Sequence, residues 1–407
     1  MSEAAWGRSP LPPVRVIRPA PWANGDDATW TVHIVDAHGI VGRAAAAVAV
    51  MADVGRETTV VRGTLRDLKR LAGALDAGRA PAATSLWNAL EPRDRWVTAQ
   101  GELRADRPII LGIVNLTEDS FSGDGVGSDV AAALARADQL REQGADIIDV
   151  GGETARADRP VRDTEDEADS MARVVGALVA GGHIVSVDTY KPPVAERALA
   201  AGAAIVNDIS GLTLGMETAE VAARAGAGYV LNYSYSVPKQ RPDAPPVYDD
   251  VVTETVGWMF ERVAQLKDTG LARASIVVDP GIAFGKSHDE DLQVLRRIGE
   301  CTSPGLPLLL AHSRKNYLGS VVARPPRERD LETHVSTVLA LAQGVRLFRV
   351  HDVAGTKRAL DVAWATLHGS AGDFGPDGES WPWRAGASAA HMTRGTADKD
   401  APQGQRW

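Results

Sequence analysis

The sequence predicts an α/β protein built on a (β/α)8 TIM barrel, with a small N-terminal α/β appendage and a disordered C-terminal tail. Two observations predict the barrel. Apolar runs suited to buried parallel strands recur eight times between residues 109 and 350, and segments of helical length and pattern lie between them. Eight such units within about 260 residues match the usual size of this barrel. An open doubly wound sheet is the alternative, but no GxGxxG motif follows the first strand.

The chain divides into three regions by pattern: an extension over 1–105, the barrel over 106–368, and a tail over 369–407 that is rich in Gly, Ala, Asp and Ser. In the extension we expect two strands and two helices, at Thr31–Val35, Thr58–Val61, Gly42–Ala52 and Thr64–Leu75.

The barrel strands are expected where the continuous apolar runs lie: Ile109–Val114, Ile147–Val150, Ile184–Val187, Ala204–Val206, Tyr229–Leu231, Ile276–Val278, Leu308–Leu310 and Leu347–Val350. Segments with helical periodicity separate them, among them Ser128–Gln143, Ala168–Leu178, Pro192–Ala201, Val251–Lys267, Asp289–Ile298 and Leu331–Ala342.

Composition narrows the functional class. The hydrophobic fraction is 44% and the charged fraction 24%, as in soluble globular proteins. A net charge of -9 argues against binding to nucleic acid or to a membrane surface. The single cysteine, Cys301, excludes an intrachain disulfide and a multi-cysteine metal site. No signal peptide is recognisable and Ala44–Met51 is too short to span a bilayer, so we expect a cytoplasmic protein.

The loop after the first barrel strand draws attention because polar residues follow an apolar run at once. Asn115, Asp119 and Phe121 lie on it, and chemistry in parallel α/β folds takes place on such loops. Polar residues also follow the other strands: Glu153, Thr154, Arg156, Asp188, Thr189, Lys191, Asn207, Asp208, Asn232, Tyr233, Asp279, Lys286, Ser313, Arg314, Lys315, Arg349, His351 and Asp352.

These strand-end residues fall into two chemical groups. Asp188, Asn207 and Asp279 suit a flat heterocycle with several N–H donors. The cationic group, Arg156, Lys315, Arg349 and His351, together with Asn115, suits a phosphate or diphosphate with a hard cation such as Mg²⁺. The alternative is a ring of salt bridges that only ties the strands together. So many polar groups at one end of a barrel favour a ligand site.

Seven motifs in order resemble dihydropteroate synthase: NLTEDSF, DVGGETAR, VDTYK, VNDISG, DPGIAFGK, HSRK and RVHDV. The resemblance runs from Ile109 to Leu367. It implies a pterin-binding barrel that joins 7,8-dihydropterin-6-ylmethyl diphosphate to 4-aminobenzoate and releases pyrophosphate, with Mg²⁺ as cofactor. It also implies a homodimer.

The resemblance implies a role for each matching residue. Asp188, Asn207, Asp279 and Lys315 would hold the pterin, with Phe284 and Asn232 beside it. Asn115, Arg156, Arg349 and His351 would hold the diphosphate, and Asn115 would also bind Mg²⁺. Asp119 and Phe121 would close over the site, and Thr154 and Asn316 would lie near the acceptor. Lys315, Asp188, Arg349 and His351 are the residues expected to carry the catalysis.

Several positions depart from the family pattern. Glu118 stands where proline is usual, Ala155 replaces a hydroxyl residue, Asn232–Tyr233 replaces Met-His, and Ala283, Ala311 and Asn316 replace Gly, Gly and Ser. Two hypotheses follow: a synthase with altered acceptor affinity, or a paralogue that uses the pterin diphosphate with a different amine or nucleophile. A catalytically silent pterin-binding protein is a third. A methyltetrahydrofolate-binding barrel fits NLTEDSF and HSRK poorly.

Overall fold

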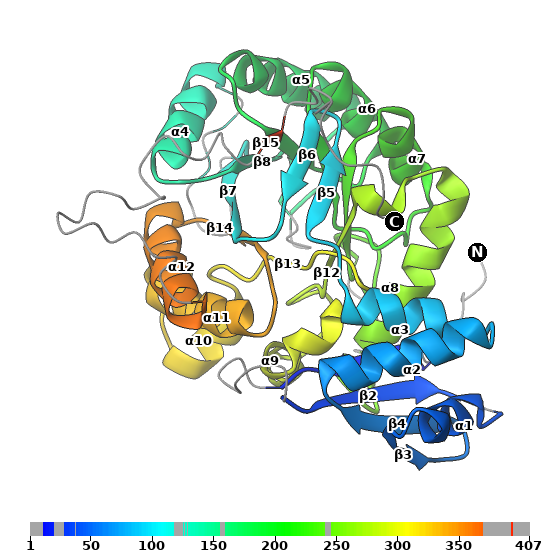
Figure 1. Ribbon diagram of the computed structural model, residues 1–407. Coiled ribbons are helices and arrows are strands. Elements are labelled where there is room, and N and C mark those ends of the chain that lie inside the picture. The colour runs from blue at the N-terminus through cyan, green and yellow to red at the C-terminus, as the bar shows by residue number, and fades with distance from the viewer. Residues whose placement is uncertain are drawn as a thin grey trace.

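The computed structural model describes residues 11–19, 28–36, 38–117, 125, 127, 129–154, 159–240, 246–368 and 392–393. Two parts are visible in Figure 1. One is a ring of strands surrounded by helices, and the other is a smaller unit, coloured blue, formed by the N-terminal part of the chain.

Within the described residues, the larger part is a closed barrel of eight parallel strands. They are β7 (Ile109–Asn115), β8 (Ile147–Gly151), β9 (Val185–Asp188), β10 (Ile205–Asp208), β11 (Gly228–Asn232), β12 (Ile276–Asp279), β13 (Leu309–Leu310) and β14 (Leu347–Val350). They pair in the order β12-β11-β10-β9-β8-β7-β14-β13. A parallel bridge between Val278 and Leu308 joins β12 to β13 and closes the ring. The predicted (β/α)8 barrel is confirmed.

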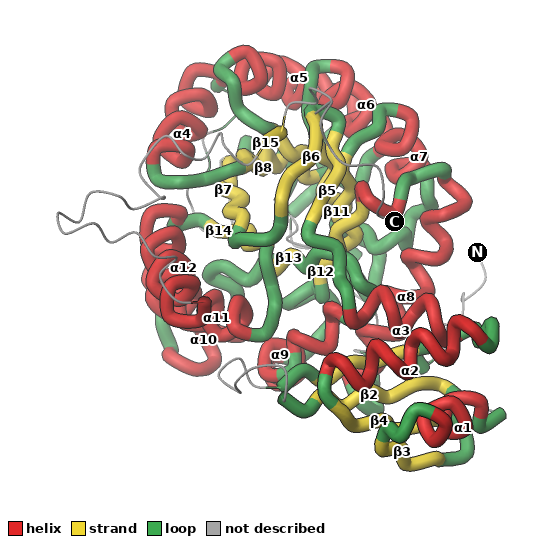
Figure 2. Tube along the Cα trace, in the orientation of Figure 1, coloured by secondary structure: helices red, strands yellow, loops and turns green. Residues whose placement is uncertain are grey.

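Helices cover the outside of the barrel, as the red tubes around the yellow strands in Figure 2 show. They are α4 (Val130–Glu142), α5 (Thr164–Ala180), α6 (Pro192–Ala200), α7 (Glu217–Arg224), α8 (Val251–Leu266), α9 (His288–Arg296), α10 (Asn316–Val322), α11 (Asp330–Ala342) and α12 (Val353–His368). Side chains fix where several of them begin. Asp129, Asp163, Asp250 and Ser287 each accept a hydrogen bond from a backbone N–H of the first turn.

Side chains on the barrel strands alternate between the inside and the outside of the ring. Outward residues such as Ile148, Val206 and Leu231 pack in the large core under the helices. Inward residues near the amino ends of the strands form a separate apolar cluster, which includes Ile109, Leu111, Ile147, Ile205, Val230, Val277, Leu309 and Leu347. The next inward position on each strand is two residues further along. At that level the inward residue is polar on β8, β10, β11, β12 and β14, whereas β7 carries Ile113.

A hairpin closes the amino end of the barrel. It consists of β5 (Arg95–Thr98) and β6 (Gly101–Arg104), which pair antiparallel. Trp96 is completely buried in the inner apolar cluster, and its Nε1 donates a hydrogen bond to the backbone oxygen of Ser275 at 2.8 Å. The hairpin therefore forms the floor of the barrel and leaves the carboxyl ends of the strands as the open end.

The predicted tail is described at two residues only. β15 (Met392–Thr393) pairs antiparallel with β6. The other residues of 369–407 lie outside the described part of the chain, so the disorder predicted for the tail stays a prediction.

The N-terminal appendage is an antiparallel sheet covered by helices. Its elements are β1 (Val14–Ile17), β2 (Trp30–Val35), α1 (Ile40–Ala47), β3 (Met51–Val54), β4 (Thr58–Gly63), α2 (Leu65–Ala77) and α3 (Ala82–Leu90). The strands lie in the order β1-β2-β4-β3. Thr64 and Asp67 form a capping box at the start of α2. Leu68, Leu71 and Leu75 of the same helix are buried in the separate core of the appendage.

One predicted helix of the appendage is present but ends earlier than predicted. The sequence predicted a helix over Gly42–Ala52, but α1 ends at Ala47 and the chain then enters β3. Ala49 adopts a left-handed φ of 56°, and the N–H of Val50 donates to the backbone oxygen of Ala45 at 2.9 Å. These are features of a helix that terminates, and the pairing of β3 with β4 then holds the chain extended.

Arg15 of β1 joins the appendage to the barrel. Its guanidinium donates to Glu300 at 3.2 Å and to Thr253 at 2.8 Å. Arg297 bridges Asp250 and Glu300 within the barrel, at 2.9 Å and 2.7 Å. The appendage is therefore attached through a network that includes the residue that caps α8.

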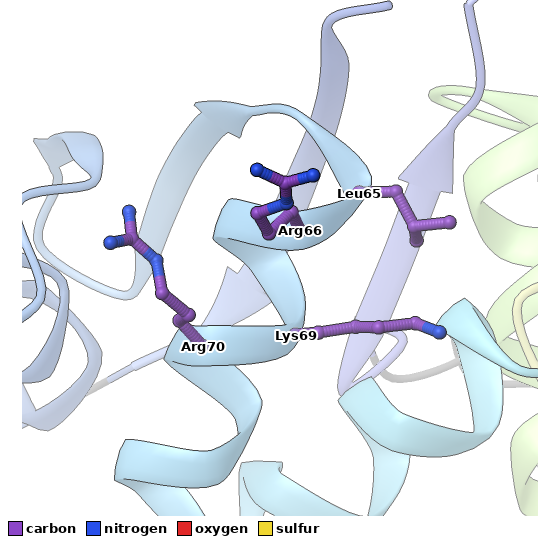
Figure 3. A pocket seen from close by; sticks show the side chains of 4 residues that line it. All are labelled: Leu65, Arg66, Lys69 and Arg70. Carbon is purple, nitrogen blue, oxygen red and sulfur yellow. The ribbon is translucent and has the colours of Figure 1, made fainter. Parts of the chain in front are cut away.

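A shallow hollow of about 440 Å³ lies on the appendage, lined by Leu65, Arg66, Lys69 and Arg70 of α2. Figure 3 shows Lys69 and Arg70 extending in opposite directions from the helix. Lys69 pairs with Glu91 at 2.6 Å and Arg70 with Asp67 at 2.8 Å. Because these cations are neutralised by neighbouring acids, the hollow is less suited to an anion than its composition indicates.

Among the described helices, none combines the length and the apolar character that crossing a bilayer requires.

A polar ring at the carboxyl end of the barrel strands

The polar residues that follow the inner apolar layer form a ring. It consists of inward residues from six strands: Asp149, Asp188, Asn207, Asn232, Asp279 and Arg349. Alternation explains the placement. Ile205 and Val230 belong to the apolar floor, and Asn207 and Asn232 are the next inward residues on the same strands. The sequence therefore places hydrogen-bonding groups directly above the inner apolar cluster.

Arg349 of β14 holds two carboxylates of the ring. Its Nε donates to Asp149 at 2.5 Å and its Nη2 donates to Asp188 at 2.6 Å. Burial raises the pKa of Asp188 to about 7, since the nearby charge of Asp149 adds to the effect and Arg349 only partly offsets it. Burial acts to lower the pKa of Arg349, but the two carboxylates outweigh it, so the guanidinium stays charged.

Asp149 was not among the residues predicted from the sequence. It lies inside β8, between Ile148 and Val150, and it is completely buried. The strand-end criterion overlooked it because it precedes the end of the strand. The alternation of inward and outward side chains could have identified it. Asp149 is two residues after Ile147, which points inward in the inner apolar cluster, so Asp149 also points inward.

Asp279 lies at the end of β12 with both carboxylate oxygens bound by backbone. Gly281 N–H donates to Oδ1 at 2.7 Å and Ala311 N–H donates to Oδ2 at 3.1 Å. Burial raises the pKa of Asp279, and the charge of Lys315 opposes the rise. These bonds hold the carboxylate in one orientation.

The two amides of the ring are also oriented. Asn207 Nδ2 lies 3.4 Å and 3.5 Å from the carboxylate oxygens of Asp149. Asn232 Nδ2 donates to the backbone oxygen of Tyr233 at 2.8 Å. Both side chains are nearly completely buried. Tyr233, the other residue of the altered dipeptide, points its hydroxyl at Tyr248, 2.8 Å away.

Lys315 approaches the ring from the start of α10. Its Nζ donates to the backbone oxygen of Ile282 at 2.7 Å and lies 4.7 Å from the ring centroid of Phe284. Burial lowers its pKa to about 8, and the carboxylate of Asp279 partly opposes this. The charges of Arg349 and Asp188 also act on the pKa of Lys315. Lys315 and Phe284 therefore line the side of the ring above Asp279.

Three further predicted residues surround the ring. His351 is buried, and its Nδ1 lies 2.9 Å from the hydroxyl of Ser313. Asn316 is exposed, and its Oδ1 accepts a hydrogen bond from Arg329 at 3.2 Å. Asn115 ends β7 beside Gly151, where an added Cβ would meet Asn115 Oδ1 at 3.3 Å and Asp188 Oδ2 at 3.7 Å. A glycine at this position keeps those oxygens open to the mouth of the barrel.

Of the remaining predicted site residues, some lie outside the part of the chain that the structure describes. Thr154 lies just after β8 and is half-buried. Asp119, Phe121 and Arg156, like Glu118 and Ala155, lie outside the described residues. Asp208, a strand-end residue, points outward and accepts a hydrogen bond from Tyr229 at 2.7 Å, so it serves the core between strand and helix.

The ring combines oriented acids and amides with two cations, Arg349 within the ring and Lys315 beside it. Buried carboxylates and amides can match the N–H groups of a polar heterocycle. Lys315 and Arg349 can attract an anionic substituent attached to it. No cluster of three or more His, Cys, Asp or Glu residues suited to a metal occurs among the described residues. The fold and the site thus define a barrel that binds a polar, anionic heterocyclic ligand at the carboxyl ends of its strands.

Comparisons with known proteins agree with this class. The family described as pterin binding enzyme matches residues 111–351. Dihydropteroate synthase of Escherichia coli strain K12 is 36% identical over 271 residues, which cover 66% of this chain and 95% of the relative. The Yersinia pestis dihydropteroate synthase in complex with a sulfonamide drug superposes with a TM-score of 0.63 at 33% identity, over 67% of this chain and 98% of that one. The Thermus thermophilus enzyme in complex with 4-aminobenzoate gives 0.60 at 34% identity, over 67% and 99%.

The chain belongs to the pterin-binding enzyme family. The matched region contains every strand of the barrel after the first two residues of β7, and it ends at His351.

Proposed function

We propose that this chain condenses 7,8-dihydropterin-6-ylmethyl diphosphate with 4-aminobenzoate and releases pyrophosphate, as a dihydropteroate synthase. The observation that carries the proposal is the ring of oriented acids and amides that Arg349 holds from within and Lys315 approaches from α10. Relatives that match over nearly their whole length bear the same enzyme name, which supports it. The test is incubation of the purified chain with both substrates and Mg²⁺, followed by measurement of pyrophosphate and dihydropteroate.

The base of the ring is assigned to the pterin. Asp279 suits the amino-pyrimidine edge, because its carboxylate is fixed by two backbone donors and can accept further N–H groups. Asn232 lies on β11, the strand that pairs with β12, and Asn207 and Asp188 follow on β10 and β9. Phe284 offers an apolar face beneath Lys315.

The diphosphate is assigned to the cationic rim. Among the described residues, Arg349 uses Nε and Nη2 for Asp149 and Asp188, which leaves Nη1 available to an anion. His351 lies on the same strand end, and the sequence adds Arg156. Lys315, whose pKa is lowered to about 8, can approach both the pterin and the leaving charge.

Mg²⁺ is proposed at Asn115. The protein offers few hard ligands there, and magnesium commonly keeps several waters and binds one or two protein oxygens together with substrate phosphate. Asn115 Oδ1, open beside Gly151, fits that mode. When bound, the ion would neutralise charge on the departing diphosphate.

The proposed reaction is dissociative. The bond between the exocyclic carbon and the diphosphate oxygen breaks, the amine nitrogen bonds to that carbon, and the amine loses a proton. The cationic rim stabilises the leaving charge. Cys301 is excluded as a nucleophile, because it is completely buried and burial raises its pKa to about 12.

A second candidate function keeps the pterin diphosphate and changes the acceptor. The observation in its favour is Asn316, a departure from the family pattern that lies where the acceptor is expected and is engaged by Arg329. Pyrophosphate release with another amine, and none with 4-aminobenzoate, would select it. Tight binding of the pterin diphosphate without turnover would instead select a silent binding protein.

A homodimer is part of the proposal. Leu331, Val335 and Leu339 recur at every fourth residue of α11 and are 70%, 54% and 61% exposed. Val362 of the adjoining α12 is 69% exposed. Such an apolar stripe suits a second copy of the chain. Sedimentation equilibrium tests this: Leu339→Glu should shift a dimer toward monomer. A cytoplasmic location rests on the sequence alone and stays a prediction.

A further inference from the structure

Glu153 binds four donors that come from three separate loops at the mouth of the barrel. Oε1 accepts from the N–H of Arg162 at 2.7 Å and from Nζ of Lys239 at 2.9 Å. Oε2 accepts from the hydroxyl of Tyr190 at 2.6 Å and from Nζ of Lys191 at 3.2 Å. The three loops are those that follow β8, β9 and β11. None of these four contacts involves a residue of the polar ring.

The two lysines also hold the returning part of the loop that contains Glu153. Lys239 Nζ donates to the backbone oxygen of Pro160 at 2.7 Å, and Lys191 Nζ donates to that of Arg162 at 2.8 Å. The segment after β8 is therefore fixed where it leaves the barrel, through Glu153, and where it returns toward α5. The same two ammonium groups make both attachments.

The arrangement is buried, and each of its two acids pairs with a lysine. The side chains of Glu153, Lys191 and Lys239 are 7%, 9% and 4% exposed. Glu167, which accepts from Lys191 at 2.7 Å, is the second acid. Two acids therefore face two lysines. Burial acts to raise the pKa of Glu153, but the hydrogen bonds from Tyr190 and Lys239 outweigh it and hold the pKa below its usual value.

The backbone at Lys239 shows that this contact is maintained against a conformational cost. Lys239 has a φ of 64°, in the left-handed region that a residue with a Cβ seldom adopts. Such outliers persist where the surroundings fix them, and they concentrate at functional sites. The loop that bears Lys239 begins directly after Asn232, a residue of the ring.

We propose that Lys239 is a positioning residue that, through Glu153 and Pro160, fixes the two described ends of the β8–α5 loop, next to Asn115 of the paired strand β7, which the proposed function assigns to the diphosphate. The proposal rests on the proposed function for the identity of the ligand. Lys239 touches no part of the base of the ring. Its loss should therefore weaken the hold on the diphosphate and leave the hold on the pterin ring intact.

The test compares two ligands by calorimetry, without an amine and therefore without turnover. Lys239→Met should weaken binding of the dihydropterin diphosphate by about 10- to 100-fold, the scale on which displaced positioning groups act. Binding of 6-hydroxymethyl-7,8-dihydropterin should change by no more than about twofold, as expected for an independent site. Lys267→Met, at an exposed lysine on the barrel surface, is the matched control and should change neither.

A second measurement does not depend on either ligand. The amide of Arg162 donates to Glu153, so its hydrogen exchange should accelerate in Lys239→Met and in the milder Lys239→Gln, and not in the control. Equal loss of both ligands, or an unchanged affinity ratio with unchanged exchange at Arg162, would overturn the proposal. If the unaltered protein binds neither ligand, the proposed function fails, and exchange at Arg162 still decides whether Lys239 positions the loop.

Discussion

Replacement of Arg349 by methionine should destabilise the protein in a way that depends on pH. The guanidinium is the shared partner of Asp149 and Asp188, whose side chains are 0% and 15% exposed. Removing one partner from a buried charge group costs about 3–5 kcal/mol. We expect the lower end of this range, about 3 kcal/mol at pH 8, because Asp188 can take up a proton in the variant.

The pH dependence follows from the raised pKa of Asp188. In the folded protein this pKa is about 7, above its unfolded value of 3.8, so the stability that protonated Asp188 contributes is lost as the pH rises through 7. Without Arg349 the pKa rises further and the variant keeps the proton at pH 8. The stability gap between the two proteins should therefore widen by about 1.4 kcal/mol between pH 5.5 and 8, one unit beyond the pKa.

Urea unfolding at pH 5.5 and pH 8 measures the gap. Arg358→Met serves as the control, because this exposed arginine lies on α12, the helix that follows the same strand. The control should show little loss at either pH. An Arg349→Met variant as stable as the control, or a gap that is constant with pH, would refute the account of the carboxylate pair.

Three further perturbations test other parts of the structure. Lys315 should lose its charge as the pH rises through about 8, so the KM for the pterin diphosphate should rise above that pH. Lys315→Arg should remove this pH dependence. A KM of the unaltered protein that does not change with pH would contradict the role of Lys315. Trp96→Ala should cost about 3–5 kcal/mol in urea unfolding by opening the barrel floor, and a loss below about 1 kcal/mol would contradict that role. Arg15→Met should cost about 1–3 kcal/mol by leaving Glu300 without its partner from the appendage, whereas the exposed Arg43→Met should cost less than about 0.5 kcal/mol; equal losses would refute it.

The barrel could be predicted from the sequence because its signal is local. Each buried strand is a short apolar run, and the polar residue that follows it indicates the carboxyl end of the barrel, where active sites lie. Asp188, Asn207 and Asp279 were found in this way. Asp149 was missed, because the criterion considers only residues at strand ends and ignores the alternation of inward and outward side chains within a strand. Asp208 fits the criterion and yet points outward, where it accepts from Tyr229.

Contacts between residues far apart in the chain were harder to predict from the sequence. Lys239 lies in a polar loop without periodicity, and its bond to the backbone of Arg159 spans eighty residues. Nothing near Lys239 in the chain indicates that partner. The end of α1 was missed for a related reason. Alanine favours a helix through Ala49, and the pairing of β3 with β4 overrides that preference.

Pyrophosphate release tests the central claim most directly. The protein should release pyrophosphate from the dihydropterin diphosphate when 4-aminobenzoate and Mg²⁺ are present, with dihydropteroate formed in equal amount. Asp279→Asn should lower kcat/KM by about 10²-fold or more, since we propose that its carboxylate, held by the N–H of Gly281, binds the pterin edge. Pyrophosphate release that requires a different amine would replace the acceptor, and no release with any amine, together with unchanged pterin binding by Asp279→Asn, would contradict the account.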